Sequence, residues 1–200
     1  MAKIDHTQLT IAAASVAAEL HHAEQTARRL TISAKNAAAI VLRAGSQAAG
    51  LSVISSFYDE LANKTISLAR VINATAVELS SLTVYEWRTS TAITHITKAY
   101  ECADKAAYRD SIKPFLSNVN SLLAETSKRF QTLLKDLNEK LEEVQRHMRA
   151  IDVIAVTSRL EAQRTGEFRD GLMQMATDIQ AQANEIKGHV ARSTVLLNHC

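Results

Sequence analysis

The chain has very little of what builds β-sheets and tight loops. Its 200 residues include five glycines and one proline, and only 4% of them are aromatic. Alanine, leucine, isoleucine, valine, serine, threonine and charged residues supply most of the rest. This composition is typical of long helices packed side by side, because sheets joined by turns need more glycine, proline and aromatic residues. We therefore predict an all-α fold.

Neither the charge nor the cysteines indicate a nucleic-acid-binding or metal-binding protein. The 23 basic and 21 acidic residues are mixed along the chain, with a net charge of +2 and no basic stripe with interleaved aromatics. Cys102 and Cys200 lack the spacing of a metal site or a disulfide. His21 and His22 point about 100° apart on a helix and have no evident third ligand. We expect no nucleic acid, no metal and no cofactor.

The sequence also lacks signals for export, membrane insertion and catalysis. Asp5, His6 and Gln8 interrupt any apolar core that a signal peptide would need. No apolar run approaches the about 20 residues that span a bilayer. No Ser/His/Asp arrangement, paired-carboxylate site or phosphate-binding loop is visible. We expect a cytoplasmic protein that is not an enzyme.

A nine-residue pattern occurs twice, and the chain is organised around it. Residues 43–51 (RAGSQAAGL) and 164–172 (RTGEFRDGL) share the pattern R-x-G-x-x-x-x-G-L at an offset of 121 residues. Four of the five glycines lie in these copies. Glycine adopts left-handed backbone angles without a Cβ clash, so a glycine pair between helical runs predicts a reversal. We name residues 43–51 the first tip and residues 164–172 the second tip.

Long helical sequence flanks both tips, and Pro114 divides the segment between them. The pattern predicts helices from about Asp5 to Ala44, from near Ala48, from near Pro114 to the second tip, and from about Phe168 to Leu197.

Proline suits the first turn of a helix and disfavours helical geometry in the residue before it. We therefore expect a reversal at about Arg109 to Lys113, with Ser111 as a candidate cap. A kink in one long helix is the alternative.

Two heptad-like seams predict the buried faces of the central helices. In the second helix the predicted seam is Leu61, Thr65, Leu68, Ile72, Thr75, Leu79, Leu82, Glu86, Thr89, Ile93, Ile96 and Tyr100. In the third helix it is Leu134, Leu137, Leu141, Val144, Met148, Ile151 and Ala155.

The helix lengths predict one elongated bundle. Residues 1–110 are expected to form a first helical hairpin and residues 111–200 a second one, together making an antiparallel four-helix coiled-coil bundle. Folding the chain at Pro114 brings both tips to one end, because a helix rises about 1.5 Å per residue. The central helices then project beyond the outer pair at the other end.

The first tip and its flanks resemble the cytoplasmic signalling hairpin of bacterial chemoreceptors, the methyl-accepting chemotaxis proteins. Residues 32–62 read ISAKNAAAIVLRAGSQAAGLSVISSFYDELA and align without a gap to that family's signature. The positions that agree are Ala34, Asn36, Ala37, Ala38, Arg43, Ala44, Gly45, Gly50, Val53, Leu61 and Ala62.

The second tip carries the same resemblance. Residues 153–179 read VIAVTSRLEAQRTGEFRDGLMQMATDI and also align without a gap. The positions that agree are Ala155, Glu161, Ala162, Arg164, Gly166, Glu167, Gly171 and Ala176. The family's tip glutamate is Ile40 in the first copy and Glu161 in the second.

The resemblance implies a function in bacterial chemotaxis. In that family two identical hairpins form a four-helix coiled coil whose tip binds a histidine kinase and an adaptor, so this chain resembles a single-chain form of two fused hairpins. It implies a cytoplasmic signal-transduction or scaffold protein that binds a chemotaxis histidine kinase, its adaptor protein or chemoreceptors. The expected partner-binding residues are Asn36, Ala37, Arg43, Gly45, Gly50, Glu161, Arg164, Gly166, Glu167, Phe168 and Gly171.

The family's receptor-trimer packing positions fall on residues of both copies. They are Arg28, Ile32 and Lys35 in the first copy, and Arg149, Val153 and Val156 in the second.

Several alternatives stay open at this stage. Arg43 and Arg164 are equally explained as cations that complement a helix C-terminus. Phe168 either anchors a partner or tucks under the turn. The chain as a whole could be a structural coiled-coil rod without chemotaxis partners, which would self-associate through the central helices near Leu82 to Leu123. A histidine phosphocarrier using His95 or His147 is the third hypothesis.

Overall fold

The computed structural model describes residues 6–103 and 106–198, and it is almost entirely helical. Its long elements are α1 (His6–Ala44), α2 (Ala49–Cys102), α3 (Lys113–Ala162) and α4 (Arg169–Asn198). Short 3-10 turns join them: η1 (Gly45–Ala48), η2 (Arg109–Ile112) and η3 (Gly166–Phe168). The described residues contain no strand, and the all-α prediction is confirmed.

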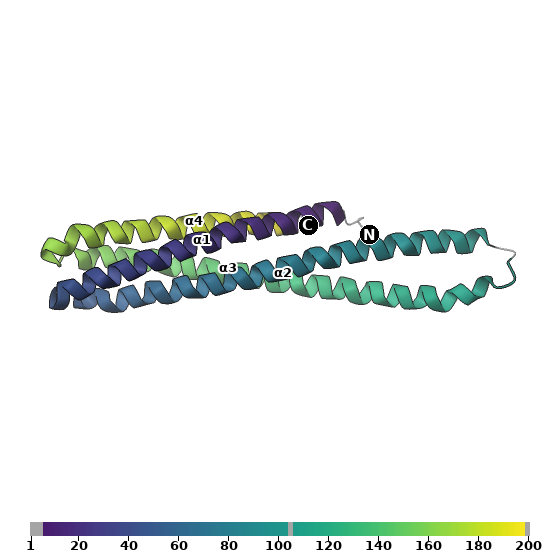
Figure 1. The fold of residues 1–200 in the computed structure, drawn as a ribbon, viewed down its shortest axis with the longest axis horizontal. Helices are drawn as coiled ribbons and strands as arrows, with labels where there is room; N and C mark the ends of the chain where they lie inside the picture. The colour runs from purple at the N-terminus through teal and green to yellow at the C-terminus, as the bar shows by residue number, and fades with distance from the viewer. Residues whose placement is uncertain (1–5, 104–105, 199–200) are drawn as a thin grey trace.

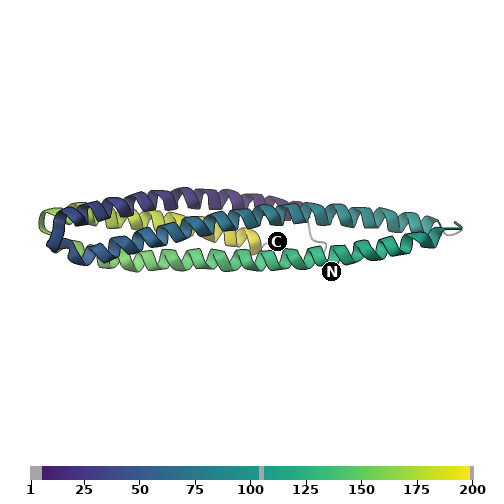
Figure 2. The same ribbon diagram turned by 60° about the horizontal axis from the view of Figure 1, so that its bottom comes forward.

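The helices lie lengthwise in a narrow rod (Figure 1). The chain runs along α1 to one end, turns through η1, and follows α2 over the full length of the rod. It turns again through η2, returns along α3, and doubles back through η3 into α4 (Figure 2). Helix α1 contacts α2 and α4, and α3 contacts the same two helices. The first and second tips therefore lie at the same end.

The reversal near Pro114 begins earlier than the sequence indicates. Helix α2 ends at Cys102, and Pro114 lies in the first turn of α3. The predicted cap at Ser111 is wrong, since its hydroxyl donates a hydrogen bond to the Tyr108 carbonyl at 2.7 Å and no side chain caps α3. A main-chain reversal, and not a kink, joins α2 to α3 (Figure 1).

Buried positions repeat with the same 121-residue offset as the tips. Most buried residues of one copy have a buried residue at the equivalent position of the other, as in the twelve pairs that follow. In α1 and α3 these pairs are Val16/Leu137, Leu20/Leu141, Ala23/Val144, Ala27/Met148, Leu30/Ile151 and Ala34/Ala155. In α2 and α4 they are Tyr58/Ile179, Ala62/Ala183, Thr65/Ile186, Ala69/Val190, Ile72/Ser193 and Ala76/Leu197. The repeat therefore extends along the core, well beyond the nine-residue pattern.

The predicted seam is correct for α3 and partly wrong for α2. In α3 the predicted seam residues are buried, except for Leu134, which is half-buried. The buried ones are Leu137, Leu141, Val144, Met148, Ile151 and Ala155. In α2 the prediction holds for Thr65, Ile72, Thr75 and Leu79, but Ala62 and Ala69 are buried in place of Leu61 and Leu68, and Ala76 is buried as well. Small side chains face the centre of the core because neighbouring helices approach α2 closely, and the leucines pack at its edge.

Polar contacts join α1 to α4 along the outside of the core. The Glu19 carboxylate accepts a hydrogen bond from Arg192 Nε at 2.9 Å and lies 2.7 Å from His189 Nδ1. Burial would raise the pKa of Glu19, but these two partners hold it below its usual value. Arg29 binds Glu185 nearby at 2.8 Å. Because the Arg192 and Arg29 side chains are more than half exposed, these pairs fix register more than they add stability.

Hydropathy alone does not assign the chain to water or membrane. The stretch Ile11–Cys102 contains an 18-residue window with a mean hydropathy of 1.4, contrary to the expectation that no apolar run is long enough to span a bilayer. Core helices of water-soluble proteins pass the same test. This stretch includes the reversal at Gly45–Ala48, so it comprises two helices, α1 and α2.

The core predicts a sharp contrast between two neighbouring α3 positions. Ile151→Ala should lower the free energy of unfolding by about 2–5 kcal/mol, because it leaves a cavity among fully buried side chains. Val153→Ala, at an exposed position two residues away, should change it by less than about 0.5 kcal/mol. Urea unfolding followed by circular dichroism measures both, and equal effects would contradict this core.

Candidate functional site

Both tips turn on a glycine in the same backbone conformation. Gly45 and Gly166, the first glycines of the repeated pattern, each have φ of +58°. An L-residue with a side chain is strained in this left-handed region, so glycine is needed at both turns. Each glycine starts a single 3-10 turn, η1 or η3, that leads into the next helix.

The second glycines each lie against the helix end that leads into the opposite tip, and a Cβ at the first glycine Gly166 would lie 3.5 Å from Gln47 Oε1 of the first tip. A Cβ at Gly50 would lie 3.1 Å from Glu161 Oε2, and a Cβ at Gly171 would lie 3.7 Å from Ile40 Cδ1. Ile40 and Glu161 are equivalent positions of the two copies. Each copy thus lays the same side-chain position across the second glycine of the other. The two tips contact each other reciprocally.

A small apolar core supports the paired tips from beneath. It consists of Val41, Ala44, Ala48, Leu51, Ala162 and Leu172. Phe168 is half-buried and packs against this cluster, as in the tucked alternative. Ala37, another predicted site residue, is buried just below it. Ala37 therefore supports the tips from within, and Phe168 is partly covered by them.

A buried hydrogen bond joins the two copies below this core. Ser158 Oγ donates to the Ile154 carbonyl at 2.8 Å, so the Tyr58 hydroxyl, 2.8 Å from Ser158 Oγ, is the donor of that bond. Burial raises the pKa of Tyr58 to about 12. A cavity of about 20 Å³ lies beside this pair, with room for about one water molecule. Tyr58 belongs to the same buried cluster as the alanine Ala34.

The charged residues of the tips face solvent. The Arg164 side chain is 78% exposed and its Nη1 lies 3.7 Å from Glu161 Oε1. Arg43 is exposed at the last turn of α1, and within the described part of the chain it makes no hydrogen bond or ion pair. Glu167 and Asn36 are exposed as well. The described tips therefore present accessible guanidinium, carboxylate and amide groups.

Exposed apolar side chains surround these polar groups. Leu42 is 81% exposed beside Arg43, and Val53 and Leu160 are about 60% exposed on α2 and α3. Sequence reasoning missed all three as site residues, although an apolar residue on the outer face of a predicted helix is itself a signal. Ile32, Val153 and Val156 are also exposed.

Among the described histidines, His21, His22 and His189 lie near one another, with the His22 and His189 rings stacked at 5.5 Å between their centroids. His95 is exposed on α2. His147 packs between α3 and its neighbours, with Nδ1 buried and lacking a hydrogen-bond partner, and burial lowers its pKa. Over the described ranges, no group of three His, Cys, Asp or Glu side chains is placed to hold a metal ion. The arrangement at the tips is suited to protein contact.

Comparisons with known proteins return no match for this chain: no protein-family model, no curated protein and no solved structure. The interpretation of the tips therefore depends on their own residues and geometry.

Alanine should lower the free energy of unfolding when it replaces a turn glycine and raise it when it replaces a glycine inside a helix. Gly45→Ala and Gly166→Ala should each lower the free energy of unfolding by about 1–2 kcal/mol, because φ of +58° strains an L-residue. Gly188→Ala, inside α4 and near only the flexible end of Arg192, should raise it by about 0.5–1 kcal/mol. Thermal or urea unfolding compares the three, and a stabilising Gly45→Ala would contradict the left-handed turn.

Proposed function

We propose that this chain is a chemoreceptor-like cytoplasmic signalling or scaffold protein that binds its partners through the paired tips. The observation that carries the proposal is the reciprocal contact of Gly50 with Glu161 and of Gly171 with Ile40. It joins two receptor-like tips into one surface at one end of the rod. The partners proposed are a chemotaxis histidine kinase, its adaptor protein or chemoreceptors of a bacterial cell.

The proposed architecture is an antiparallel four-helix coiled-coil bundle of two fused hairpins. Residues 1–110 supply one hairpin and residues 111–200 the other, in place of the two chains of a receptor dimer. The 121-residue repeat of buried positions supports this assignment, since an ancestral pair of equal hairpins would bury equivalent residues. The contacts of α1 and α3 with both α2 and α4 support it too.

The proposed recognition surface combines apolar contact with charge. Leu42, Val53 and Leu160 offer exposed apolar area, which contributes about 25 cal/mol per Å² when a partner covers it. Arg43 and Arg164 extend into solvent beside them, where they can bind carboxylates of the partner. Charge complementarity then selects the partner and orients it. This mode of binding needs no cofactor and no catalytic step.

A structural rod without chemotaxis partners is the second candidate function. The observation that favours it is the projecting part of α2 and α3, which carries none of the tip features (Figure 1). The phosphocarrier hypothesis has less support, because the His147 ring is packed and His95 lies on an open helix face without a neighbouring acid or base cluster.

Charge reversal at the tips tests the signalling proposal. Arg43→Glu combined with Arg164→Glu should weaken capture of the chemotaxis kinase and adaptor of the same organism at least about tenfold, equivalent to about 1.4 kcal/mol. Arg146→Glu, an exposed arginine far along α3, should leave capture unchanged. Pull-down and calorimetry with purified partners measure the effect.

Two results would contradict the tip assignment. If the double variant binds as well as the wild type, the arginines are helix-terminal cations and no more. If the wild type captures neither protein, the rod hypothesis replaces the signalling one.

A further inference from the structure

The end of the rod opposite the tips consists of two helices alone. Helices α1 and α4 stop partway along, while α2 and α3 continue to their reversal (Figures 1 and 2). Thr83 is the last buried residue of α2 and Thr126 the first of α3, and none of the described residues between them is buried. We name residues 84–125 the projecting hairpin. Such a hairpin has no enclosed core of its own.

The packing seam of α2 and α3 nevertheless continues along the projecting hairpin. In α2 the buried residues Ile72, Ala76, Leu79 and Thr83 follow steps of four and three. The same steps lead to half-buried residues: Glu86, Ser90, Ile93, Thr97 and Tyr100. In α3 the half-buried residues Leu116, Val119 and Leu123 continue the run of apolar side chains. The seam therefore extends past the helices that cover it.

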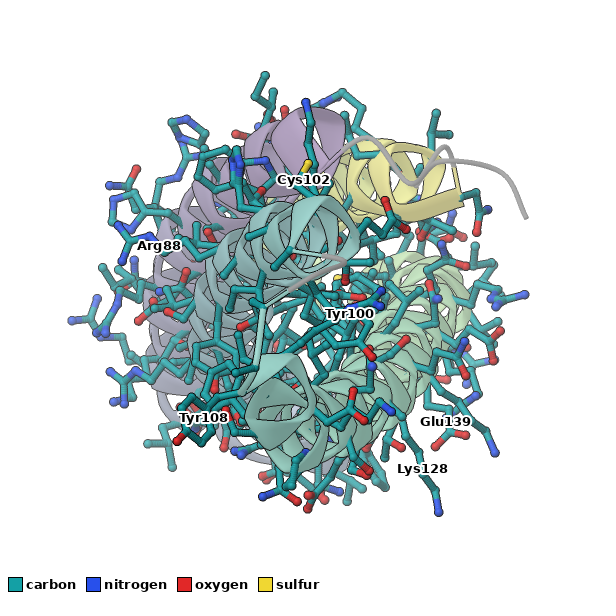
Figure 3. All side chains as sticks on the ribbon, turned by 90° about the vertical axis from the view of Figure 1, so that its right-hand side faces the viewer. Arg88, Tyr100, Cys102, Tyr108, Lys128 and Glu139 are labelled. Atoms are coloured by element: carbon teal, nitrogen blue, oxygen red, sulfur yellow. The ribbon has the colours of Figure 1, made fainter. Side chains whose placement is uncertain are left out.

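Polar contacts join the end of α2 to η2 in the described part of the projecting hairpin. The Arg109 guanidinium lies 4.1 Å from the centroid of the Tyr100 ring, and its Nε donates to the Tyr100 carbonyl at 3.0 Å. The Tyr100 hydroxyl donates to Asp110 Oδ1 at 3.0 Å, and Lys113 pairs with the same carboxylate. Viewed from this end, Tyr100 lies between α2 and α3, whereas Arg88 and Lys128 point outward (Figure 3). These contacts fix the position of Tyr100 at the end of the seam, where a partner can pack against it.

We propose that the projecting hairpin pairs with that of a second copy of this chain, tail to tail, so that the tips lie at opposite ends of a double rod. Along the covered half, α1 and α4 already occupy the face where a partner hairpin would lie. A second copy running parallel would collide with them. An antiparallel copy covers the exposed face of the projecting hairpin. The overlap of the two copies ends where α1 and α4 begin to cover that face.

Length, charge and aromatic content favour a second copy as the occupant. The free segment of α2, residues 84–102, is about 28 Å long. The projecting hairpin of a second copy has the same length because it has the same sequence. The projecting hairpin has five basic and five acidic residues, so it carries no excess of either charge that would oppose self-pairing. Trp87, four residues after Thr83, borders the seam and is exposed. Tryptophan is enriched among residues that anchor interfaces. The inference does not depend on what the tips bind.

The mass and the length of the particle test this pairing together. Sedimentation equilibrium should give twice the 21.9 kDa of one chain. Small-angle X-ray scattering should give a maximum dimension of about 130 Å, against about 80 Å for one rod. A monomer, or a dimer no longer than one rod, would overturn the proposal. Arg43→Glu combined with Arg164→Glu should leave mass and length unchanged, which separates this pairing from association through the tips.

A matched pair of lysine substitutions locates the interface. Ile93→Lys, on the seam, should weaken dimerisation at least about a hundredfold, because it buries an unpaired charge. His95→Lys, two residues away at an exposed position, should leave it unchanged. Thr97→Leu adds apolar area to the seam and should tighten dimerisation about tenfold or more, even if Ile93→Lys frays the hairpin. Equal effects of the two lysines, or no tightening by Thr97→Leu, would exclude this face.

Discussion

Close approach of helices over small side chains is the constraint on which the rest of this structure depends. Alanines occupy many core positions, among them Ala27, Ala34, Ala62 and Ala69. An alanine buries little apolar area, so stability has to be gathered over a long interface or from larger partners. Both occur here, since the helices are long and the second copy supplies Met148 and Val190 where the first has Ala27 and Ala69. The rod is narrow for the same reason.

The helix boundaries were predictable because the chain is punctuated at few places. Gly45 and Gly166 permit left-handed turns and Pro114 fixes its own φ, so the observed helices begin or end within a few residues of the predicted points, except that α2 ends early, at Cys102. The core register of α2 was not predictable from hydrophobicity, since Leu61 is more apolar than Ala62 yet lies at the edge of the core. Steric fit between helices decides such a position, and a single sequence does not contain the neighbour.

The tips likewise combine features that the sequence predicts with contacts that it does not. A pattern of arginine and glycine is visible in the sequence, and both turn glycines have the backbone that the pattern predicts. The contact of Glu161 with Gly50, and of Tyr58 with Ser158 100 residues away, needs the two copies placed side by side. Leu42 and Leu160 were not predicted as site residues, because that prediction used the positions that agree with the receptor signature and these two leucines lie between such positions. Their exposure is evident only once the buried face is known.

Covalent fusion of the two copies has an evolutionary consequence. In a homodimer every substitution appears twice, so a change that helps one partner contact is imposed on its symmetry mate as well. Here the reversal between α2 and α3 ties both copies into one gene product, and each position mutates alone. Ile40 and Glu161 already differ in charge while keeping equivalent places against the opposing glycines. One surface can therefore hold two chemistries, and selection can tune either tip while the other stays constant.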